Sequence, residues 1–137
     1  MVHSSNPELV FAATGGGLYR SNDGGEVWEL LYDCYCREVW LDANDAEHII
    51  FGPADYVGAA GRIEESRDGG KTWKLASDGV DVPWPRTIPE RLTQVREELF
   101  CVLDDGRLLA ARLDEMTWEY ILEEVEGVNA VVGKFLK

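Results

Sequence analysis

A pattern of eight residues occurs twice in this sequence, and the two copies are 45 residues apart. The first copy is Ser21-Asn22-Asp23-Gly24-Gly25-Glu26-Val27-Trp28, and the second is Ser66-Arg67-Asp68-Gly69-Gly70-Lys71-Thr72-Trp73. A further step of the same length leads to Trp118, where only the tryptophan of the pattern remains. Repeats of about 20–50 residues are typical of proteins that stack similar small units in a row. The chain is therefore expected to fold as repeated units.

Each unit contains short apolar or β-branched segments separated by glycine turns, as expected of β-strands. The units span approximately residues 8–32, 37–77 and 90–123. Units of about 45 residues with several short strands are typical of β-propeller blades. The sequence therefore predicts an all-β fold, in which residues 1–137 form one domain of three four-stranded blades.

The two ends of the chain depart from the repeat. The first unit shows only three strands, whereas an additional strand at 127–133, with the apolar stretch Val128 to Val132, follows the third unit. β-Propellers have about four to eight blades, and six is the only multiple of three in that range. We therefore expect a homodimer that forms a six-bladed ring, with each additional strand completing the first blade of the other chain. A fragment of a longer propeller, or an engineered half, would show the same pattern.

The repeated pattern suits a tight hairpin. Glycine adopts the positive φ that such a turn requires. The aspartate carboxylate and, more weakly, the serine hydroxyl can accept hydrogen bonds from backbone N–H groups of the turn. The tryptophan packs a large ring against the blade. A calcium site at Asp23 or Asp68 is a weaker alternative, because calcium takes about six to eight oxygen ligands.

The pattern Ser-x-Asp-x-Gly-x-x-Trp resembles the Asp-box, or BNR repeat, of sialidases and other glycosidases, sortilin-type receptor domains and photosystem II assembly factors. The residues that carry the resemblance are Ser21, Asp23, Gly25, Trp28, Ser66, Asp68, Gly70, Trp73 and Trp118. The third copy has Ala111, Leu113 and Glu115 at its other positions, so a looser hairpin is expected there. The resemblance implies a β-propeller whose hairpins are structural and lie on the outer rim, away from the central channel.

The composition restricts the classes of partner. The chain has 26 acidic and 13 basic residues and a net charge of −13, which disfavours binding to nucleic acids and to anionic membranes. No apolar run reaches the ~18 residues of a transmembrane helix, and the N-terminus lacks the pattern of a signal peptide. Three cysteines, an odd number, do not make a disulfide framework and favour a cytoplasmic location.

The candidate ligand site consists of residues expected on the inner strands, around the central channel. Arg37 and Arg91 could bind a carboxylate, and Trp40 could stack against a sugar or a peptide. The same side chains could instead only fill and solvate the channel. No cofactor and no metal site is predicted, because zinc needs about four ligands and the candidates are scattered. Those candidates are Cys34, Cys36, Cys101, His48 and His3, the last expected in a loose terminus.

The function predicted from these observations is non-catalytic binding or scaffolding, with a small polar ligand, a glycan or a peptide as the partner. The first alternative is a glycan-active enzyme related to sialidases, and the second is an assembly factor like the photosystem II proteins. A sialidase carries an Arg-Ile-Pro motif before its boxes. The similar string Arg86-Thr87-Ile88-Pro89 follows the boxes and contains one additional residue. Nothing in the sequence pairs a tyrosine with a base, which favours the non-catalytic function.

Overall fold

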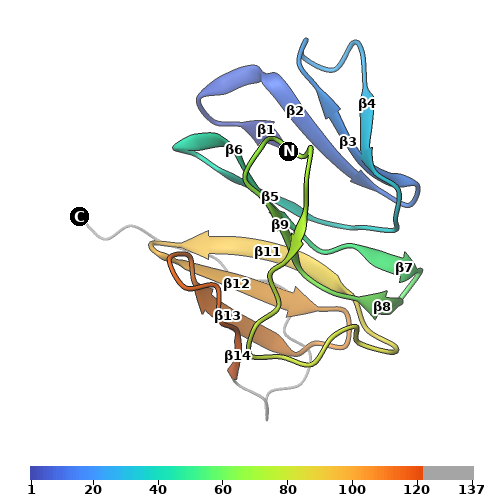
Figure 1. The fold of residues 1–137 in the computed structure, drawn as a ribbon, viewed down its shortest axis with the longest axis vertical. Helices are drawn as coiled ribbons and strands as arrows, with labels where there is room; N and C mark the ends of the chain where they lie inside the picture. The colour runs from blue at the N-terminus through green and yellow to red at the C-terminus, as the bar shows by residue number, and fades with distance from the viewer. Residues whose placement is uncertain (122–137) are drawn as a thin grey trace.

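The computed structural model describes residues 1–121, which form three four-stranded antiparallel sheets stacked in chain order (Figure 1). We call these sheets blades 1, 2 and 3. The described residues contain no helix, so the expected all-β architecture is confirmed. Among them, accordingly, no helix is long and apolar enough to cross a membrane. The strands of blade 1 are β1 (Val2–His3), β2 (Asn6–Thr14), β3 (Gly17–Ser21) and β4 (Glu29–Tyr32).

Blades 2 and 3 follow the same meander, and blade 2 carries an additional hairpin between its second and third strands. The strands of blade 2 are β5 (Val39–Asp42), β6 (Asp45–Phe51), β9 (Glu64–Ser66) and β10 (Lys74–Leu75). The additional hairpin consists of β7 (Ala54–Tyr56) and β8 (Ala59–Gly61). Blade 3 contains β11 (Pro89–Val95), β12 (Glu98–Leu103), β13 (Leu108–Arg112) and β14 (Glu119–Ile121).

The first strand of blade 1 corrects the expectation from the sequence that this unit has only three strands. Val2 is the register partner of Val10, and His3 is the partner of Asn6, so blade 1 begins at Val2. His3 is buried, and its Nε2 lies 2.8 Å from the backbone oxygen of Asp42 in blade 2, so the terminus is not loose here. A two-residue strand is too short to show an alternating pattern, which is why the sequence did not indicate it. The additional strand predicted at 127–133 lies outside the described residues.

Two apolar clusters hold the blades together, one at each junction. The cluster between blades 1 and 2 contains Leu9, Phe11, Leu18, Cys36, Val39, Leu41, Ile49 and Phe51. The cluster between blades 2 and 3 contains Trp40, Ile50, Ile63, Ala76, Trp84, Leu92, Leu99, Cys101, Leu103, Leu109, Ala111, Met116 and Trp118. Neighbouring residues of β6, such as Ile49 and Ile50, alternate between the two clusters because successive side chains of a strand point to opposite faces. Both faces of blade 2 are therefore buried.

The two eight-residue hairpins have the hydrogen bonds that the sequence predicts. In the second, Oδ1 of Asp68 accepts backbone N–H groups of Lys71 and Thr72 at 3.0 and 2.9 Å. The Ser66 hydroxyl accepts the N–H of Gly70 at 2.8 Å. Gly69 and Gly70 have φ angles of 74° and 94°, which side chains other than glycine rarely adopt. The first hairpin repeats this arrangement with Asp23, Ser21 and Gly25.

The third turn lacks a side-chain acceptor, as expected from its sequence. The backbone oxygen of Arg112 instead accepts the N–H groups of Glu115 and Met116 at 3.1 and 2.8 Å. Trp118 keeps its packing role, because its ring is buried and its Nε1 donates to the backbone oxygen of Ala76 at 2.8 Å. Packing between blades is therefore retained where the turn chemistry is lost.

Candidate functional site

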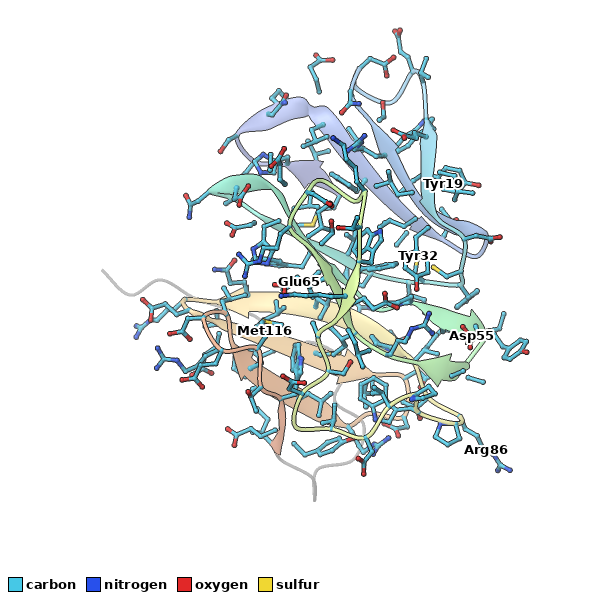
Figure 2. All side chains as sticks on the ribbon, viewed as in Figure 1. Tyr19, Tyr32, Asp55, Glu65, Arg86 and Met116 are labelled. Atoms are coloured by element: carbon cyan, nitrogen blue, oxygen red, sulfur yellow. The ribbon has the colours of Figure 1, made fainter. Side chains whose placement is uncertain are left out.

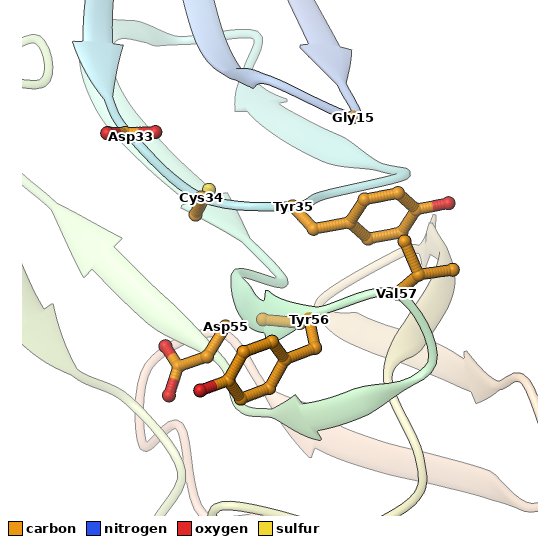
Figure 3. Close-up of a pocket in the computed structure, with 8 residues that line it drawn as sticks. Gly15, Asp33, Cys34, Tyr35, Asp55, Tyr56 and Val57 are labelled. Carbon is orange, nitrogen blue, oxygen red and sulfur yellow. The ribbon is translucent and has the colours of Figure 1, made fainter.

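An open cleft of about 580 Å³ lies at the junction of blades 1 and 2. One side is formed by the connection from β4 to β5, and the other by the β7–β8 hairpin (Figure 3). The volume is within the range of roughly 300–1,000 Å³ that is typical of small-molecule sites. The residues that line the cleft are Gly15, Asp33, Cys34, Tyr35, Ala54, Asp55, Tyr56 and Val57.

The backbone fixes the two sides of the cleft relative to each other. The N–H of Tyr35 donates to the oxygen of Ala54 at 2.9 Å, and the N–H of Ala54 donates back at 2.8 Å. Gly61 is the register partner of Ala54 at the base of the hairpin, and a Cβ there would lie 2.5 Å from the backbone oxygen of Thr87, so only glycine fits. The hairpin is thus anchored at its base to both neighbouring segments, and its tip is free to contact a ligand.

The lining combines aromatic rings with carboxylates. Tyr56 is 69% exposed at the tip of the hairpin, and Tyr35 is half-buried on the opposite side. Asp33 lies on the side of Tyr35, and Asp55 on the side of Tyr56 (Figure 3). Arg37 extends the site, because its Nε donates to the Tyr35 hydroxyl at 3.2 Å. An aromatic face and carboxylate oxygens together suit a ligand that has both C–H faces and hydroxyl groups.

A polar network continues from the cleft into the junction of the two blades. The Tyr32 hydroxyl donates to Oε2 of Glu64 at 2.7 Å, and Arg62 binds the same Oε2 at 2.6 Å through its Nε. The Nη2 of Arg62 donates to the Tyr32 hydroxyl oxygen at 2.9 Å, and its Nη1 donates to Oδ1 of Asp55 at 3.1 Å. Tyr32 and Asp55 lie on the same side of the molecule, near the cleft (Figure 2). Arg62 therefore fixes the carboxylate of Asp55 through a hydrogen bond from within this network.

The Tyr32–Glu64 pair is the functional feature that the sequence did not reveal. Burial raises the pKa of Tyr32, and the hydrogen bond to Glu64 raises it further, whereas Arg62 acts in the opposite direction. The two residues come from different blades, on β4 and β9. Only the stacking of blades brings them together, and no spacing in the sequence could indicate that contact.

The three residues predicted for a channel site have different environments. Arg37 is exposed beside the cleft and lies 3.6 Å from Glu90 of blade 3. Trp40 is only 4% exposed, lies edge-on to His48, and donates its indole N–H to Gln94. Arg91 is exposed on β11. Trp40 therefore offers no free face for stacking, and of the three only Arg37 adjoins the cleft.

His48 occupies the centre of blade 2, between two carboxylates. Its Nδ1 lies 3.0 Å from Asp42 on β5, and its Nε2 lies 2.7 Å from Glu65 on β9. His48, which is on β6, thereby links three neighbouring strands of the blade. Burial lowers the pKa of His48, but the bonds to Glu65 and Asp42 outweigh this effect and raise it. The bond from His48 lowers the pKa of Glu65 to about 2. The histidine is thus structural, as a cation satisfied on both ring nitrogens.

The three cysteines have different environments. All three thiols are free, and residues 1–121 contain no group of three or more side chains placed to hold a metal ion. The hydrogen bond from Cys34 lowers the pKa of Cys36 and raises that of Cys34. Burial raises the pKa of Cys101, which lies within the junction of blades 2 and 3.

Comparison with known proteins finds solved structures with a similar fold. No protein-family model and no curated protein sequence matches the chain. A solved structure of a GH74 enzyme from Niastella koreensis matches with a TM-score of 0.68 and 21% identity, over 87% of this chain and 20% of that one. An ancestral GH74 enzyme matches with a TM-score of 0.68 and 16% identity, over 88% of this chain and 18% of that one. The chain thus spans about a fifth of each of these neighbours.

Three stacked four-stranded antiparallel blades, together with these neighbours, define the chain as an all-β protein of the β-propeller class. At this identity the likeness concerns the fold alone. The predicted fold class is therefore confirmed, and the chemistry of the cleft has to be argued from its own residues.

Proposed function

We propose that this propeller unit recognises glycans and that the cleft between blades 1 and 2 holds the sugar. The observation that carries the proposal is the lining itself, in which two tyrosines and two aspartates face a common open space. Sugars present an apolar C–H face and a ring of hydroxyl groups. Tyr56 and Tyr35 can cover the former, and the carboxylates of Asp33 and Asp55 can accept hydrogen bonds from the latter.

Contacts with neighbouring side chains hold two of the lining residues in positions that suit ligand binding. Asp55 is held by Arg62 at 3.1 Å, so its orientation is fixed before a ligand arrives. The Tyr35 ring is held by Arg37, whose guanidinium carbon lies 5.5 Å from the ring centroid. A preformed site loses less conformational freedom on binding than a mobile one. The likeness to glycoside hydrolases in fold supports the choice of glycans as the ligand class.

Glycan hydrolysis is the second candidate, and one observation favours it. Glycoside hydrolases use two carboxylates on either side of the scissile bond, and Asp33 and Asp55 line opposite sides of the cleft. Catalysis by Tyr32 is disfavoured, because a tyrosine nucleophile needs a lowered pKa and that of Tyr32 is raised. We therefore assign any hydrolytic activity to the two aspartates and not to the Tyr32–Glu64 pair.

A glycan array followed by hydrolysis assays separates the two functions. The wild-type protein is expected to bind a subset of neutral oligosaccharides, since its net charge of −13 repels anionic ones. The same sugars, as fluorogenic glycosides, test for cleavage. Recognition alone predicts binding without turnover. Turnover that Asp33→Asn or Asp55→Asn abolishes would establish hydrolysis, and the absence of binding to any glycan would refute the proposal.

A further inference from the structure

Two free cysteines, separated by one residue, meet at the wall of the cleft. Cys34 is half-buried and lines the cleft (Figure 3), whereas Cys36 is buried in the apolar cluster between blades 1 and 2. The thiol of Cys34 donates a hydrogen bond to the sulfur of Cys36. One sulfur of the pair is therefore open to solutes that enter the cleft, and the other lies behind it.

The backbone around the two cysteines brings their sulfurs within bonding reach. The N–H of Cys36 donates to the oxygen of Thr14 at 3.1 Å, and the intervening Tyr35 is bridged to Ala54 in both directions. Residues two apart in an extended chain have Cα atoms about 6.4–6.8 Å apart, and a bend at Cys34 shortens this span. Disulfides join Cα atoms that are about 4.4–6.8 Å apart. A bond between these two sulfurs is therefore compatible with the fold.

The protonation of the two thiols suits a reaction with an oxidant. The hydrogen bond between them raises the pKa of Cys34 and lowers that of Cys36, so the shared proton resides on the exposed sulfur. Thiolates are the nucleophiles in cysteine oxidation and disulfide formation. Transfer of the proton along this hydrogen bond allows either sulfur to act as the thiolate. Cys101 differs from both, because it is fully buried at the other junction and burial raises its pKa.

We infer that Cys34 and Cys36 are a modification site, which hydrogen peroxide converts to an intramolecular disulfide that alters the cleft. The Cys34 sulfur attacks one peroxide oxygen, the O–O bond breaks, and the leaving oxygen takes up a proton as water. The Cys36 thiolate then attacks the sulfenic sulfur of Cys34, the S–O bond breaks, and the hydroxide takes up a proton as the second water. Two thiols and one hydrogen peroxide thus give one disulfide and two waters.

The disulfide changes the side of the cleft that carries Tyr35. Bonded sulfurs lie about 2.05 Å apart, closer than two hydrogen-bonded thiols, so one cysteine has to move. Cys36 is buried and held by Thr14, which leaves Cys34 to move, together with the adjoining Tyr35. We expect the oxidised protein to bind a glycan at least tenfold more weakly. This effect on affinity rests on the proposed function, whereas formation of the disulfide does not.

Intact mass spectrometry and thiol titration after treatment with hydrogen peroxide test the disulfide. The reduced wild type has three thiols. The oxidised protein should lose two hydrogens and keep only the thiol of Cys101, and dithiothreitol should restore the other two. Peptide mapping of the wild type locates the bond without any variant. Retention of all three thiols, or a disulfide that includes Cys101 or a second chain, overturns the inference.

Two variants separate the roles of the cysteines. Cys36→Ser removes the buried partner, so oxidation should stop at a sulfenic acid on Cys34, which gains one oxygen and is trapped by dimedone. Cys101→Ala is the control and should form the same disulfide as the wild type. Circular dichroism checks that both variants are folded.

Calorimetric titration with a glycan, before oxidation, after oxidation and after reduction, tests the effect on the cleft. Weaker binding that dithiothreitol reverses supports the inference, and an unchanged affinity of the disulfide form overturns it. If the reduced protein binds no glycan, the proposed function fails, and hydrogen–deuterium exchange of the Tyr35 and Ala54 amides becomes the measurement. Faster exchange in the disulfide form then supports an altered cleft, and identical exchange overturns it.

Discussion

His48 is a single residue that joins the three central positions of blade 2. It is 3% exposed and is bonded to Asp42 on β5 and Glu65 on β9, while Arg67 and Lys74 contact Glu65 from the outer side. A buried histidine between two carboxylates is stabilised as the cation. The imidazolium of His48 and the carboxylate of Glu65 therefore stabilise each other, and Arg67 and Lys74 add to the stabilisation of the Glu65 carboxylate.

The pH dependence of unfolding follows from these two pKa values. The raised pKa of His48 gives stability that is present below about pH 6.5 and is lost as the pH rises through the folded-state value. The lowered pKa of Glu65 gives stability that is present above about pH 4.3 and is lost as the pH falls towards 2. We expect His48→Gln to cost roughly 1.5–3 kcal/mol between these limits, because Glu65 and Asp42 lose their hydrogen bonds to the charged imidazole while Glu65 keeps Arg67 and Lys74.

Thermal unfolding measured as a function of pH checks this expectation. The difference between wild type and His48→Gln should be greatest near pH 5–6 and should shrink as the pH rises, because the wild type then loses its histidine cation. Asn44→Gln, an exposed change in the nearby turn, should follow the wild-type curve. A constant difference at every pH would contradict a charged His48.

At the level of elements, the β7–β8 hairpin is the insertion that makes blade 2 differ from its neighbours. Its base fits because Gly61 lacks a side chain where Thr87 and Ile88 pass within contact distance. The N–H of Gly61 donates to the Thr87 oxygen at 3.1 Å, and the N–H of Trp84 donates to the Gly61 oxygen at 2.9 Å. The long connection between blades 2 and 3 is thereby tied to the hairpin that forms the cleft.

Gly61→Ala is expected to destabilise the protein by roughly 1–3 kcal/mol, the usual cost of overpacking. The added Cβ would lie 2.5 Å from the Thr87 oxygen and 2.6 Å from the Ile88 Cα, and backbone atoms cannot move aside cheaply. Gly16→Ala is the control, because its nearest neighbour would be the Thr14 hydroxyl at 4.0 Å. Denaturant unfolding compares the two. Equal midpoints would show that the hairpin base is not packed as described.

The sequence predicts contacts between residues that are close in the chain, but it does not predict contacts between blades. The hairpins around Asp23 and Asp68 were predictable, because their acceptors and donors lie within four residues of each other. The fold class followed from the period of those hairpins. Strand β1 was missed because two residues carry no periodicity. The Tyr32–Glu64 pair and the burial of Trp40 were missed because they are set by neighbouring blades, which no local pattern encodes.

At the scale of the whole molecule, the junction between blades supplies both structure and site. Each junction buries an apolar cluster, and the first of them also opens into the cleft. Residues from β4, the β4–β5 connection and the β7–β8 hairpin meet only because blades 1 and 2 are stacked. The additional hairpin of blade 2, which blades 1 and 3 lack, explains why the cleft is found at this junction. We therefore expect recognition at one place and not at every junction.

Calorimetric titration of an oligosaccharide selected on the array tests the central claim that this cleft binds glycans. Wild type should bind, and Tyr56→Ala should bind at least tenfold more weakly, a loss of about 1.4 kcal/mol, because the exposed ring at the hairpin tip is removed. Tyr56→Phe keeps the ring and should bind almost as well as wild type, and Leu75→Ala, at an exposed residue outside the cleft lining, should bind like wild type. Unaltered affinity of the Tyr56→Ala protein would place the glycan elsewhere and contradict the account.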